Sequence, residues 1–380
     1  MGLGKVVIAP DSFKGALTSQ QVTDVIAGEV GAAFPDCVIK KMPIADGGEG
    51  SVDTILSSIG GTFFTVMVLS PDDREIEAGF GIASNGAAIL EMAQSSGITK
   101  QKGLNPMTST TFGFGQLILA ALDRGAREFM LGIGGSATTD GGCGMASALG
   151  VRFFDAFGEG FVPCGETLEL IDKIDLSGID PRVADCSFTV MCDVENPLFG
   201  TNGAAYIYGP QKGATPEQII ILDKGLRHFS VKLQECFGKD FSDIPGSGAA
   251  GGLGAGCVAF LGATLKSGIE AILNICDFRT HVADADLIIT GEGKLDSQSF
   301  QGKVLSGIMA EAGGVPVWSI CGVCDCDEAV LRENGLIVFE ASEGVTVEES
   351  IREPVKYLRL AVQRAMQEAG RPCVLPLRGS

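Results

Sequence analysis

The sequence predicts an α/β protein of two domains, one of which is assembled from both ends of the chain. Short apolar runs alternate with amphipathic helical stretches over residues 6–59 and again after 286, which is typical of parallel sheets covered by helices. The middle of the chain begins instead with strand-like runs joined by tight turns. The 380 residues also exceed the size at which single cores stop growing, roughly 250–300 residues.

The first stretch of the chain reads as strand, helix, strand, helix. An apolar run ends just before Pro10, as expected for a buried parallel strand. Thr18 and Gln21 have the spacing of a capping box at the start of a helix, and Pro35 ends that helix. The expected elements are strands at Val6–Ala9 and Val38–Ile44 and helices at 18–34 and Val52–Ile59.

The middle of the chain begins with a meander and then mixes helices with strands. Turn sequences at 71–73 and 84–86 separate three strand-like runs. Thr215, Pro216 and Gln218 form a second capped helix start. The expected elements are strands at Thr62–Leu69, Glu75–Ile82, Ala87–Met92, Glu128–Ile133 and Phe188–Val194, and a helix near Gly115–Arg124.

The alternation of strand and helix returns after Asp286. Because the two chain ends share this pattern, we expect one α/β domain from residues 1–62 and 284–380, with a mixed α/β domain, 63–283, inserted between them. The expected C-terminal elements are strands at Leu287–Thr290, Val315–Ile320 and Leu336–Phe339 and helices at Phe300–Ala312, Asp327–Asn334 and Val347–Met366.

Composition excludes several classes of protein. Lys and Arg number 28 and Asp and Glu 47, so the net charge of −19 argues against a nucleic-acid partner, which needs a basic face. Residues 1–10 lack the apolar core of a signal peptide, so we expect the 12 cysteines to be reduced thiols of a cytoplasmic protein. Pro245–Leu265 carries no charge, but its seven glycines favour a closely packed buried helix over a membrane span.

Three loops at predicted strand ends, residues 9–15, 45–50 and 290–296, combine glycine with carboxylates. Because the carboxyl ends of parallel strands meet at one edge of a sheet, we expect these loops to lie together. Glycine lets a ligand approach closely, carboxylates hold hydrated Mg²⁺, and the lysines Lys14 and Lys294 can neutralise phosphate. Each loop alone also fits a tight turn capped by Asp or Glu.

The middle of the chain has a further glycine-rich loop, residues 132–142, between a strand and a helix. Its free N–H groups, with the hydroxyls of Ser136 and Thr138, predict an anion site, although a plain capped helix remains an alternative. Asp193 follows the next predicted strand, and a strand end can orient its carboxylate well. The alternative is that Asp193 only ties a structural loop. Asn196 is a candidate ligand, and Lys212 lies between residues that fix the turn.

Several sharper motifs are missing from the sequence. No Gly-Lys pair is followed by Ser or Thr, which excludes a Walker A loop, and no GxSxG elbow indicates a serine hydrolase. Residues 246–251 have GxGxxG spacing, but no apolar strand precedes them. Cys321, Cys324 and Cys326 lack the second ligand pair that a closed zinc site needs.

Seven motifs, in order along almost the whole chain, resemble the bacterial-type glycerate kinase family, the glycerate 2-kinases. The stretch after Gly335 matches more loosely, and Cys321–Cys326 lies outside the family pattern. The motifs are Ala9-Pro-Asp-Ser-Phe-Lys-Gly15, Ala45-Asp-Gly-Gly-Glu-Gly50, Gly134-Gly-Ser-Ala-Thr138 with Asp140-Gly-Gly, Cys192-Asp-Val with Asn196-Pro-Leu, Gly209-Pro-Gln-Lys-Gly213, Gly248-Ala-Ala-Gly-Gly-Leu-Gly254, and Thr290-Gly-Glu-Gly with Leu295-Asp296.

The resemblance implies ATP-dependent phosphorylation of D-glycerate with Mg²⁺, a flavodoxin-like domain built from both chain ends, and an inserted mixed α/β domain. We expect the active site in the cleft between the domains. Lys14 and Lys294 are expected to neutralise the transferring phosphoryl group, and Asp193 to accept the hydroxyl proton. Asp46, Glu49 and Asp296 are expected metal ligands. The expected substrate- or phosphate-binding residues are Asp11, Ser12, Gly134, Gly135, Ser136, Thr138, Asn196, Lys212, Glu292 and Gly293.

Phosphorylation of the 2-hydroxyl, giving 2-phospho-D-glycerate and ADP, is the favoured reaction. A kinase giving 3-phosphoglycerate, a kinase for another small hydroxy acid and a non-catalytic anion-binding protein remain alternatives. The expected partners are the small-molecule substrates D-glycerate and ATP, with neither nucleic acid nor membrane, and a homodimer is left open.

Overall fold

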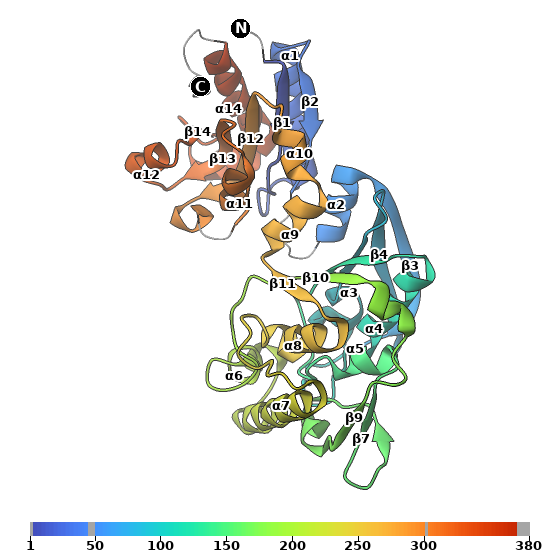
Figure 1. Ribbon diagram of the computed structural model, residues 1–380. Coiled ribbons are helices and arrows are strands. Elements are labelled where there is room, and N and C mark those ends of the chain that lie inside the picture. The colour runs from blue at the N-terminus through green and yellow to red at the C-terminus, as the bar shows by residue number, and fades with distance from the viewer. Residues whose placement is uncertain (1–2, 45–49, 301–302, 371–380) are drawn as a thin grey trace. The chain divides into compact units, whose positions relative to one another are not determined.

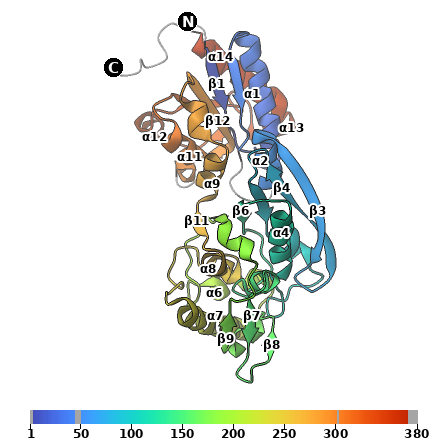
Figure 2. The same ribbon diagram turned by 45° about the vertical axis from the view of Figure 1, so that its right-hand side comes forward.

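The computed structural model describes residues 3–44, 50–300 and 303–370. The contacts within the chain divide it into two compact units (Figures 1 and 2). The first unit comprises Met1–Asp46, Asp53–Gly60 and Ile272–Ser380, and the second comprises Gly47–Val52 and Gly61–Ala271. The first unit is therefore built from both ends of the chain. The domain boundaries expected near residues 62 and 284 stay predictions.

The first unit contains a five-stranded, fully parallel sheet with the order β14-β13-β12-β1-β2. Numbered by their order in the chain, its strands run 2-1-3-4-5, which is the flavodoxin-like order. The order reverses between β1 and β12, and ligands of such sheets bind at the carboxyl ends of the strands near this point. The strands are β1 (Lys5–Ile8), β2 (Val38–Lys41), β12 (Leu287–Leu295), β13 (Val317–Cys324) and β14 (Ile337–Glu340).

Helices α1 and α14 pack against each other and share a core with the sheet. The predicted capping box at Thr18 and Gln21 is present, with Oγ1 of Thr18 accepting the Gln21 N–H at 3.2 Å. Two of the unit boundaries fall within α2 (Ser51–Ile59) and α9 (Gly268–Ile275). The other helices of this unit are α1 (Ser19–Ala33), α10 (Phe278–Val282), η5 (Ser297–Phe300), α11 (Val304–Glu311), α12 (Glu328–Glu333), α13 (Val347–Arg352) and α14 (Pro354–Ala369).

The second unit contains a mixed six-stranded sheet with the order β11-β10-β6-β5-β4-β3. The predicted meander forms its antiparallel part, and β5, β6, β10 and β11 run parallel. A small sheet, β8-β7-β9, was not predicted. The strands are β3 (Gly61–Leu69), β4 (Glu75–Ala83), β5 (Ala88–Glu91), β6 (Glu128–Gly132), β7 (Arg152–Phe154), β8 (Gly160–Phe161), β9 (Lys173–Asp175), β10 (Ser187–Met191) and β11 (Thr264–Lys266).

Helix α8 is the closely packed helix expected in the uncharged segment 245–265. A Cβ atom on Gly256 would lie 2.4 Å from the carbonyl oxygen of Gly141, so only glycine permits this approach. Among the described residues, no helix has the length and apolar character to cross a membrane. The helices of this unit are α3 (Ala93–Ser96), η1 (Ile98–Lys100), α4 (Phe112–Asp123), α5 (Cys143–Ala148), η2 (Gly165–Leu170), η3 (Pro181–Asp185), α6 (Ala204–Tyr208), η4 (Pro210–Lys212), α7 (Pro216–Phe237) and α8 (Ala249–Leu261).

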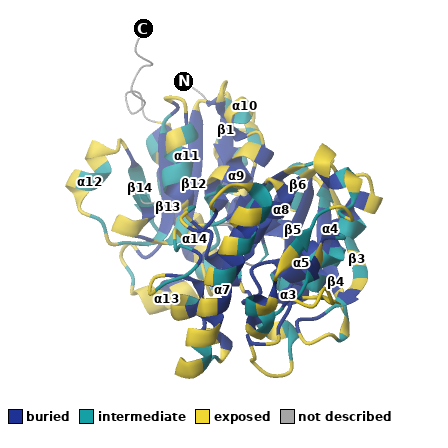
Figure 3. Cartoon of the chain, turned by 60° about the horizontal axis from the view of Figure 1, so that its bottom comes forward, coloured by how far each residue is buried: buried dark blue, intermediate teal, exposed yellow. Residues whose placement is uncertain are grey.

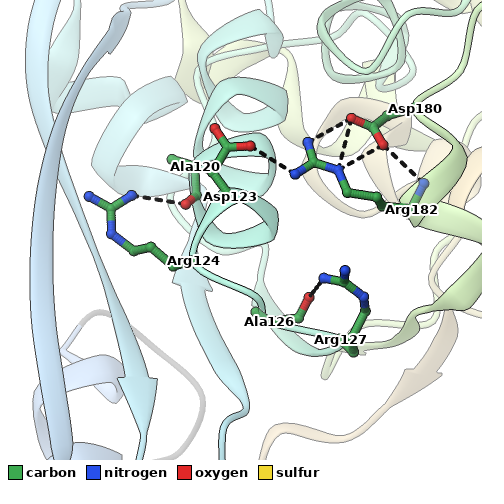
Figure 4. A network of polar contacts seen from close by, with 7 residues as sticks. All are labelled: Ala120, Asp123, Arg124, Ala126, Arg127, Asp180 and Arg182. Atoms are coloured by element: carbon green, nitrogen blue, oxygen red, sulfur yellow. Dashed lines mark hydrogen bonds and ion pairs between the residues drawn. The ribbon is translucent and has the colours of Figure 1, made fainter.

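Ion pairs tie the connection before β10 to α4, as Figure 4 shows. The guanidinium of Arg182 lies 2.7 Å from Asp180 and 2.8 Å from Asp123. Arg124, at the end of α4, donates to the carbonyl oxygen of Ala120 at 2.9 Å. These partly exposed pairs contribute modestly to stability, about 1 kcal/mol or less each.

Two predictions about the C-terminal elements were wrong. The helix expected over Val347–Met366 is split into α13 and α14, because Pro354 cannot donate a helical N–H and instead begins α14. Residues Gly291–Leu295, expected in a loop, extend β12 along β13. Gly291 permits this pairing, since a Cβ there would lie 2.2 Å from the Ile320 carbonyl oxygen. Figure 3 shows how β12 and β13 are buried, whereas α12 is exposed.

Candidate active site

One group of candidate residues lies at the carboxyl ends of β1 and β12, which we call the β1–β12 edge. The N–H of Asp11 donates to the carbonyl oxygen of Gly291 at 2.8 Å, and Oδ1 of Asp11 accepts the N–H of Ser12 at 2.6 Å. Gly293 packs on Phe13, because a Cβ on it would lie 3.3 Å from the Phe13 Cα. The structure therefore brings the segments 9–15 and 290–296 together at the switch point of the sheet.

Carboxylates crowd this edge. Glu292 is half-buried, and burial, followed by smaller repulsions from Asp11 and Asp296, raises its pKa to about 7. Ser299 and Lys303 oppose this shift. Oδ1 of Asp296 accepts the N–H of Gln298 at 3.0 Å.

The two lysines predicted to neutralise phosphate are both exposed. Nζ of Lys294 lies 3.1 Å from Oδ2 of Asp325 and 3.8 Å from Oδ2 of Asp296, so carboxylates already balance its charge. Lys14 follows β1 at the same edge. The predicted metal ligands Asp46 and Glu49 lie outside the described residues.

A second group lies at the carboxyl ends of the parallel strands of the mixed sheet. The predicted anion loop follows β6 and is held against the segment after β5. The N–H of Ala137 donates to the Ser96 carbonyl oxygen, and the N–H of Ile98 to that of Gly135, each at 3.0 Å. Gly135 has a φ of +72°, which favours glycine. No Cβ contact within 4 Å restricts Gly134.

Lys212 lies beneath this loop and is only 2% exposed. Its Nζ donates to Oγ of Ser136 at 3.1 Å and to the carbonyl oxygen of Thr138 at 2.5 Å. Burial lowers the pKa of Lys212 to about 7, although the Asp140 carboxylate favours its charged form. Lys212 thus supports the loop from inside the unit, and its predicted direct contact with a ligand stays a prediction.

Asp140 is the most strongly held carboxylate of this group, and it was not among the predicted site residues. It is fully buried, and its oxygens accept the N–H and O–H of Thr111 at 2.8 and 2.7 Å. They also accept the N–H groups of Gly142 at 3.1 Å and Gly144 at 3.2 Å. Burial raises the pKa of Asp140, whereas these donors stabilise the anion. Asp140 thereby fixes the end of the loop.

Asp193 and Asn196 follow β10. Asp193 is exposed, and its Oδ1 accepts the N–H of Gly268 at 2.9 Å, which orients the carboxylate at the strand end. The amide of Asn196 donates to the Asn202 carbonyl oxygen at 2.8 Å and accepts the Tyr208 hydroxyl at 2.7 Å. Asn196 therefore uses both polar ends within its own loop, and its role as a ligand stays a prediction.

A sequence model described as "Glycerate kinase family" matches residues 6–369, almost the whole chain. The protein belongs to the glycerate kinase family. It is therefore a kinase, as the family resemblance of its motifs predicted.

Similar glycerate kinases cover nearly the whole chain. A glycerate 2-kinase of Escherichia coli K12 is 42% identical over 355 residues, which cover 92% of this chain and 93% of that protein. A glycerate kinase of Halalkalibacterium halodurans is 44% identical over 340 residues, covering 88% and 89%. A crystal structure described as that of a glycerate kinase 2 from Salmonella typhimurium LT2 has a TM-score of 0.86 at 37% identity, covering 96% and 98%.

Glu91 is a further residue of this glycerate kinase that sequence reasoning missed. It ends β5, is 4% exposed, and accepts the N–H of Val52 at 3.1 Å. The N–H groups of Gly50 and Ser51 also interact with it, so it anchors the start of α2, directly after the predicted loop 45–50. A carboxylate ending an otherwise apolar strand was the signal that could have found it.

Proposed function

We propose that the protein transfers the γ-phosphoryl group of ATP to the 2-hydroxyl of D-glycerate, giving 2-phospho-D-glycerate and ADP. Membership of the glycerate kinase family supports phosphorylation of glycerate. The observation that carries the chemistry is the glycine-rich loop 134–138 held over the buried Lys212. A buried lysine beneath the exposed backbone of Gly134 and Gly135 suits a small anion.

The loop over Lys212 is proposed to bind either the carboxylate of glycerate or a nucleotide phosphate. Gly134 and Gly135 leave the backbone open to an approaching ligand. The hydroxyl groups of Ser136 and Thr138 are buried within the loop, 3.2 Å apart, and Lys212 adds positive potential through the loop when it is protonated. Preorganised N–H donors of this kind bind anions without reorganisation during the reaction.

Asp193 is proposed to accept the proton of the glycerate hydroxyl. Its position after β10, oriented by the N–H of Gly268, is suited to a general base. A weakly basic carboxylate suffices because phosphoryl transfer passes through a loose transition state, in which the attacking oxygen carries little charge.

The β1–β12 edge is proposed to bind the phosphates and their metal ion. Mg²⁺ would relieve the repulsion among Asp11, Glu292 and Asp296, and it prefers such oxygen ligands. Among residues 3–44, 50–300 and 303–370, no three His, Cys, Asp or Glu side chains together form a metal cage. That fits Mg²⁺, which shares one or two carboxylates with water and substrate phosphates. When bound, Mg²⁺ neutralises charge on the β- and γ-phosphates.

The lysines of this edge would then meet the transferring group. Lys294 exchanges Asp325 for a phosphate oxygen, and Lys14 adds a second positive charge.

A coupled assay tests the proposed reaction. The protein is incubated with ATP, Mg²⁺ and D-glycerate, and enolase detects 2-phosphoglycerate with and without phosphoglycerate mutase. We expect a signal without mutase. A signal only with mutase would show phosphorylation of the 3-hydroxyl instead. ADP release with other hydroxy acids but not with D-glycerate would change the substrate, and binding without ADP release would indicate an anion-binding protein.

A further inference from the structure

The outermost strand of the mixed sheet, β3, has an open edge. It is the last strand in the order β11-β10-β6-β5-β4-β3, and among the described strands its 9 residues pair only with β4. Figures 1 and 2 show β3 along the outside of the sheet of the second unit. A strand with a single neighbour leaves the N–H and C=O groups of every second residue without a strand partner.

A hairpin turn determines which backbone groups of β3 face outward. Ser70, directly after β3, donates its N–H to the Arg74 carbonyl oxygen at 2.8 Å, so the backbone groups of Ser70 face β4. This direction alternates from one residue to the next along an antiparallel strand. Phe63, Thr65 and Met67 are therefore the residues whose N–H and C=O groups face away from β4.

Two further hydrogen bonds agree with this alternation. At the other end of β4, Ala83 donates its N–H to the Ala87 carbonyl oxygen at 2.8 Å, so the backbone groups of Ala83 face β5. The outward N–H of Leu69 donates to Oε1 of Gln116 at 2.7 Å, which closes that end of the edge. The three outward residues before Leu69 have no such bond to any described residue, so their backbone groups are open to a partner.

The side chains of the same three residues lie together on one face of the sheet and are exposed. Phe63 is 46% and Met67 is 60% exposed. Part of the Phe63 ring covers Gly79 of β4, where a Cβ would lie 2.2 Å from the ring. The intervening residues Phe64 and Val66 pack against the hydrophobic core. The edge thus presents apolar side chains directly beside unpaired backbone groups.

The other edges of the two larger sheets are protected against association. Proteins protect sheet edges with short strands, charges, prolines or bulges. The edge strands β2, β14 and β11 have 4, 4 and 3 residues, and each contains a charged residue: Lys41, Glu340 and Lys266. Strand β3 has neither charge nor proline, and its register with β4 has no bulge. Its edge is therefore suited to pairing with a further strand.

We propose that β3 pairs antiparallel with β3 of a second copy of this chain, about a two-fold axis at Thr65. The Thr65 residues of the two copies then exchange N–H···O bonds, and Phe63 does so with the partner's Met67. Each outward residue meets another outward residue, so the open backbone groups of all three positions find partners. The side chains also match, because an aromatic ring beside a thioether and Thr beside Thr are favourable neighbours.

Charge favours this occupant at this place. The net charge of −19 makes two copies repel each other over most of their surfaces. Strand β3 is uncharged, and the carboxylates on its exposed face, Glu75 and Glu77, lie one strand further from the edge, on β4. A partner recognised by positive charge would find no carboxylate on β3 itself. A second copy brings the same uncharged strand, so the two approach where their repulsion is smallest.

Sedimentation equilibrium of the full-length protein, from about 1 to 100 μM, tests the proposal. We expect the mass of two chains at the upper end for the wild type and for Thr65→Val, the matched control that keeps the backbone N–H. Thr65→Pro removes that N–H at the centre of the interface, and an edge strand tolerates proline there, so we expect the mass of one chain. Met67→Lys places a charge on the edge and should also remain a single chain.

Hydrogen exchange of the wild type, resolved by residue, shows where the copies meet and does not depend on how the variants fold. The monomer fraction of a mostly dimeric sample falls with the square root of concentration. Exchange of the outward N–H groups of Phe63, Thr65 and Met67 should therefore slow by up to about tenfold between 1 and 100 μM. The N–H groups of Phe64 and Val66 face β4 and, as the internal control, should be protected at both concentrations.

Three results would overturn the proposal. The first is the mass of one chain over the whole concentration range. The second is a dimer that Thr65→Pro leaves intact. The third is a dimer in which the outward N–H groups of β3 exchange equally fast at both concentrations, since the copies would then meet elsewhere.

Discussion

The Lys212→Met substitution removes a buried amine and keeps an unbranched side chain. Burial lowers the Lys212 pKa from 10.5 to about 7, so burying this lysine at pH 7 opposes folding by about 4 kcal/mol. Methionine avoids that term but leaves the buried Thr138 carbonyl oxygen without its 2.5 Å donor, which costs about 1–3 kcal/mol. The variant should therefore be more stable than the wild type at pH 7, by about 1–3 kcal/mol.

The stability difference between Lys212→Met and the wild type should also depend on pH. The folded pKa lies below the unfolded one, so the unfolded chain binds the extra proton between about pH 7 and 10.5, and wild-type stability rises with pH there. At pH 9 the free-energy cost of burying Lys212 falls to about 2 kcal/mol. The stability advantage of Lys212→Met should thus shrink by about 2 kcal/mol from pH 7 to pH 9, while its turnover is strongly reduced at both.

Pulsed alkylation in urea measures the free energy of unfolding of the second compact unit, which contains Lys212. The sole tryptophan, Trp318, lies in the other unit, so its fluorescence would not report on Lys212. Cys143 and Cys257 are buried in the second unit and become reactive when it unfolds. Cys276, buried in the first unit, is the internal control and should be unaffected. A variant destabilised by about 2 kcal/mol or more at both pH values would refute the reasoning and make Lys212 an ordinary structural donor.

Three further predictions concern the same group of residues. Asp140→Asn places an NH₂ group against N–H donors and should lower the free energy of unfolding by about 2–4 kcal/mol, measured by the same alkylation. An unchanged urea midpoint would contradict the role of these hydrogen bonds in holding the loop. Asp193→Asn should lower kcat by about 10²–10⁴-fold and leave the glycerate KM within a few-fold, and normal turnover would remove Asp193 as the base. Binding of D-glycerate at pH 8 should be accompanied by uptake of as much as about 0.9 proton, because Lys212 becomes charged. The difference in binding enthalpy between two buffers measures this uptake by calorimetry. The same uptake in Lys212→Met would exclude Lys212 as its source.

Local features of the fold could be predicted because they depend on neighbouring residues. The capping boxes at Thr18 and Thr215 were predicted correctly, since each needs only a hydroxyl and a Gln three residues later. The meander was predicted from its turn sequences. The extension of β12 was missed because the Gly291–Leu295 sequence is typical of a loop, and the strand forms only against β13.

The candidate site was predictable in its residue types but not in its burial. Lys212 lies in a Gly-Pro-Gln-Lys-Gly sequence typical of an exposed turn, and its partner Ser136 is 76 residues away. Only tertiary packing makes that lysine a buried amine with a lowered pKa. Asp140 belongs to an Asp-Gly-Gly motif, but two of the four hydrogen bonds that hold it come from Thr111, which no local pattern connects with it.

Phosphorus-31 NMR tests the central claim most directly, because it follows the transferred group itself. The protein is incubated with ATP, Mg²⁺ and D-glycerate, and the proton-coupled spectrum is recorded as ATP is consumed. The account predicts ADP together with a phosphomonoester doublet, since the carbon bearing the 2-hydroxyl has a single hydrogen. A triplet would place the phosphate on the 3-hydroxyl, and free inorganic phosphate or unchanged ATP would contradict phosphoryl transfer to glycerate.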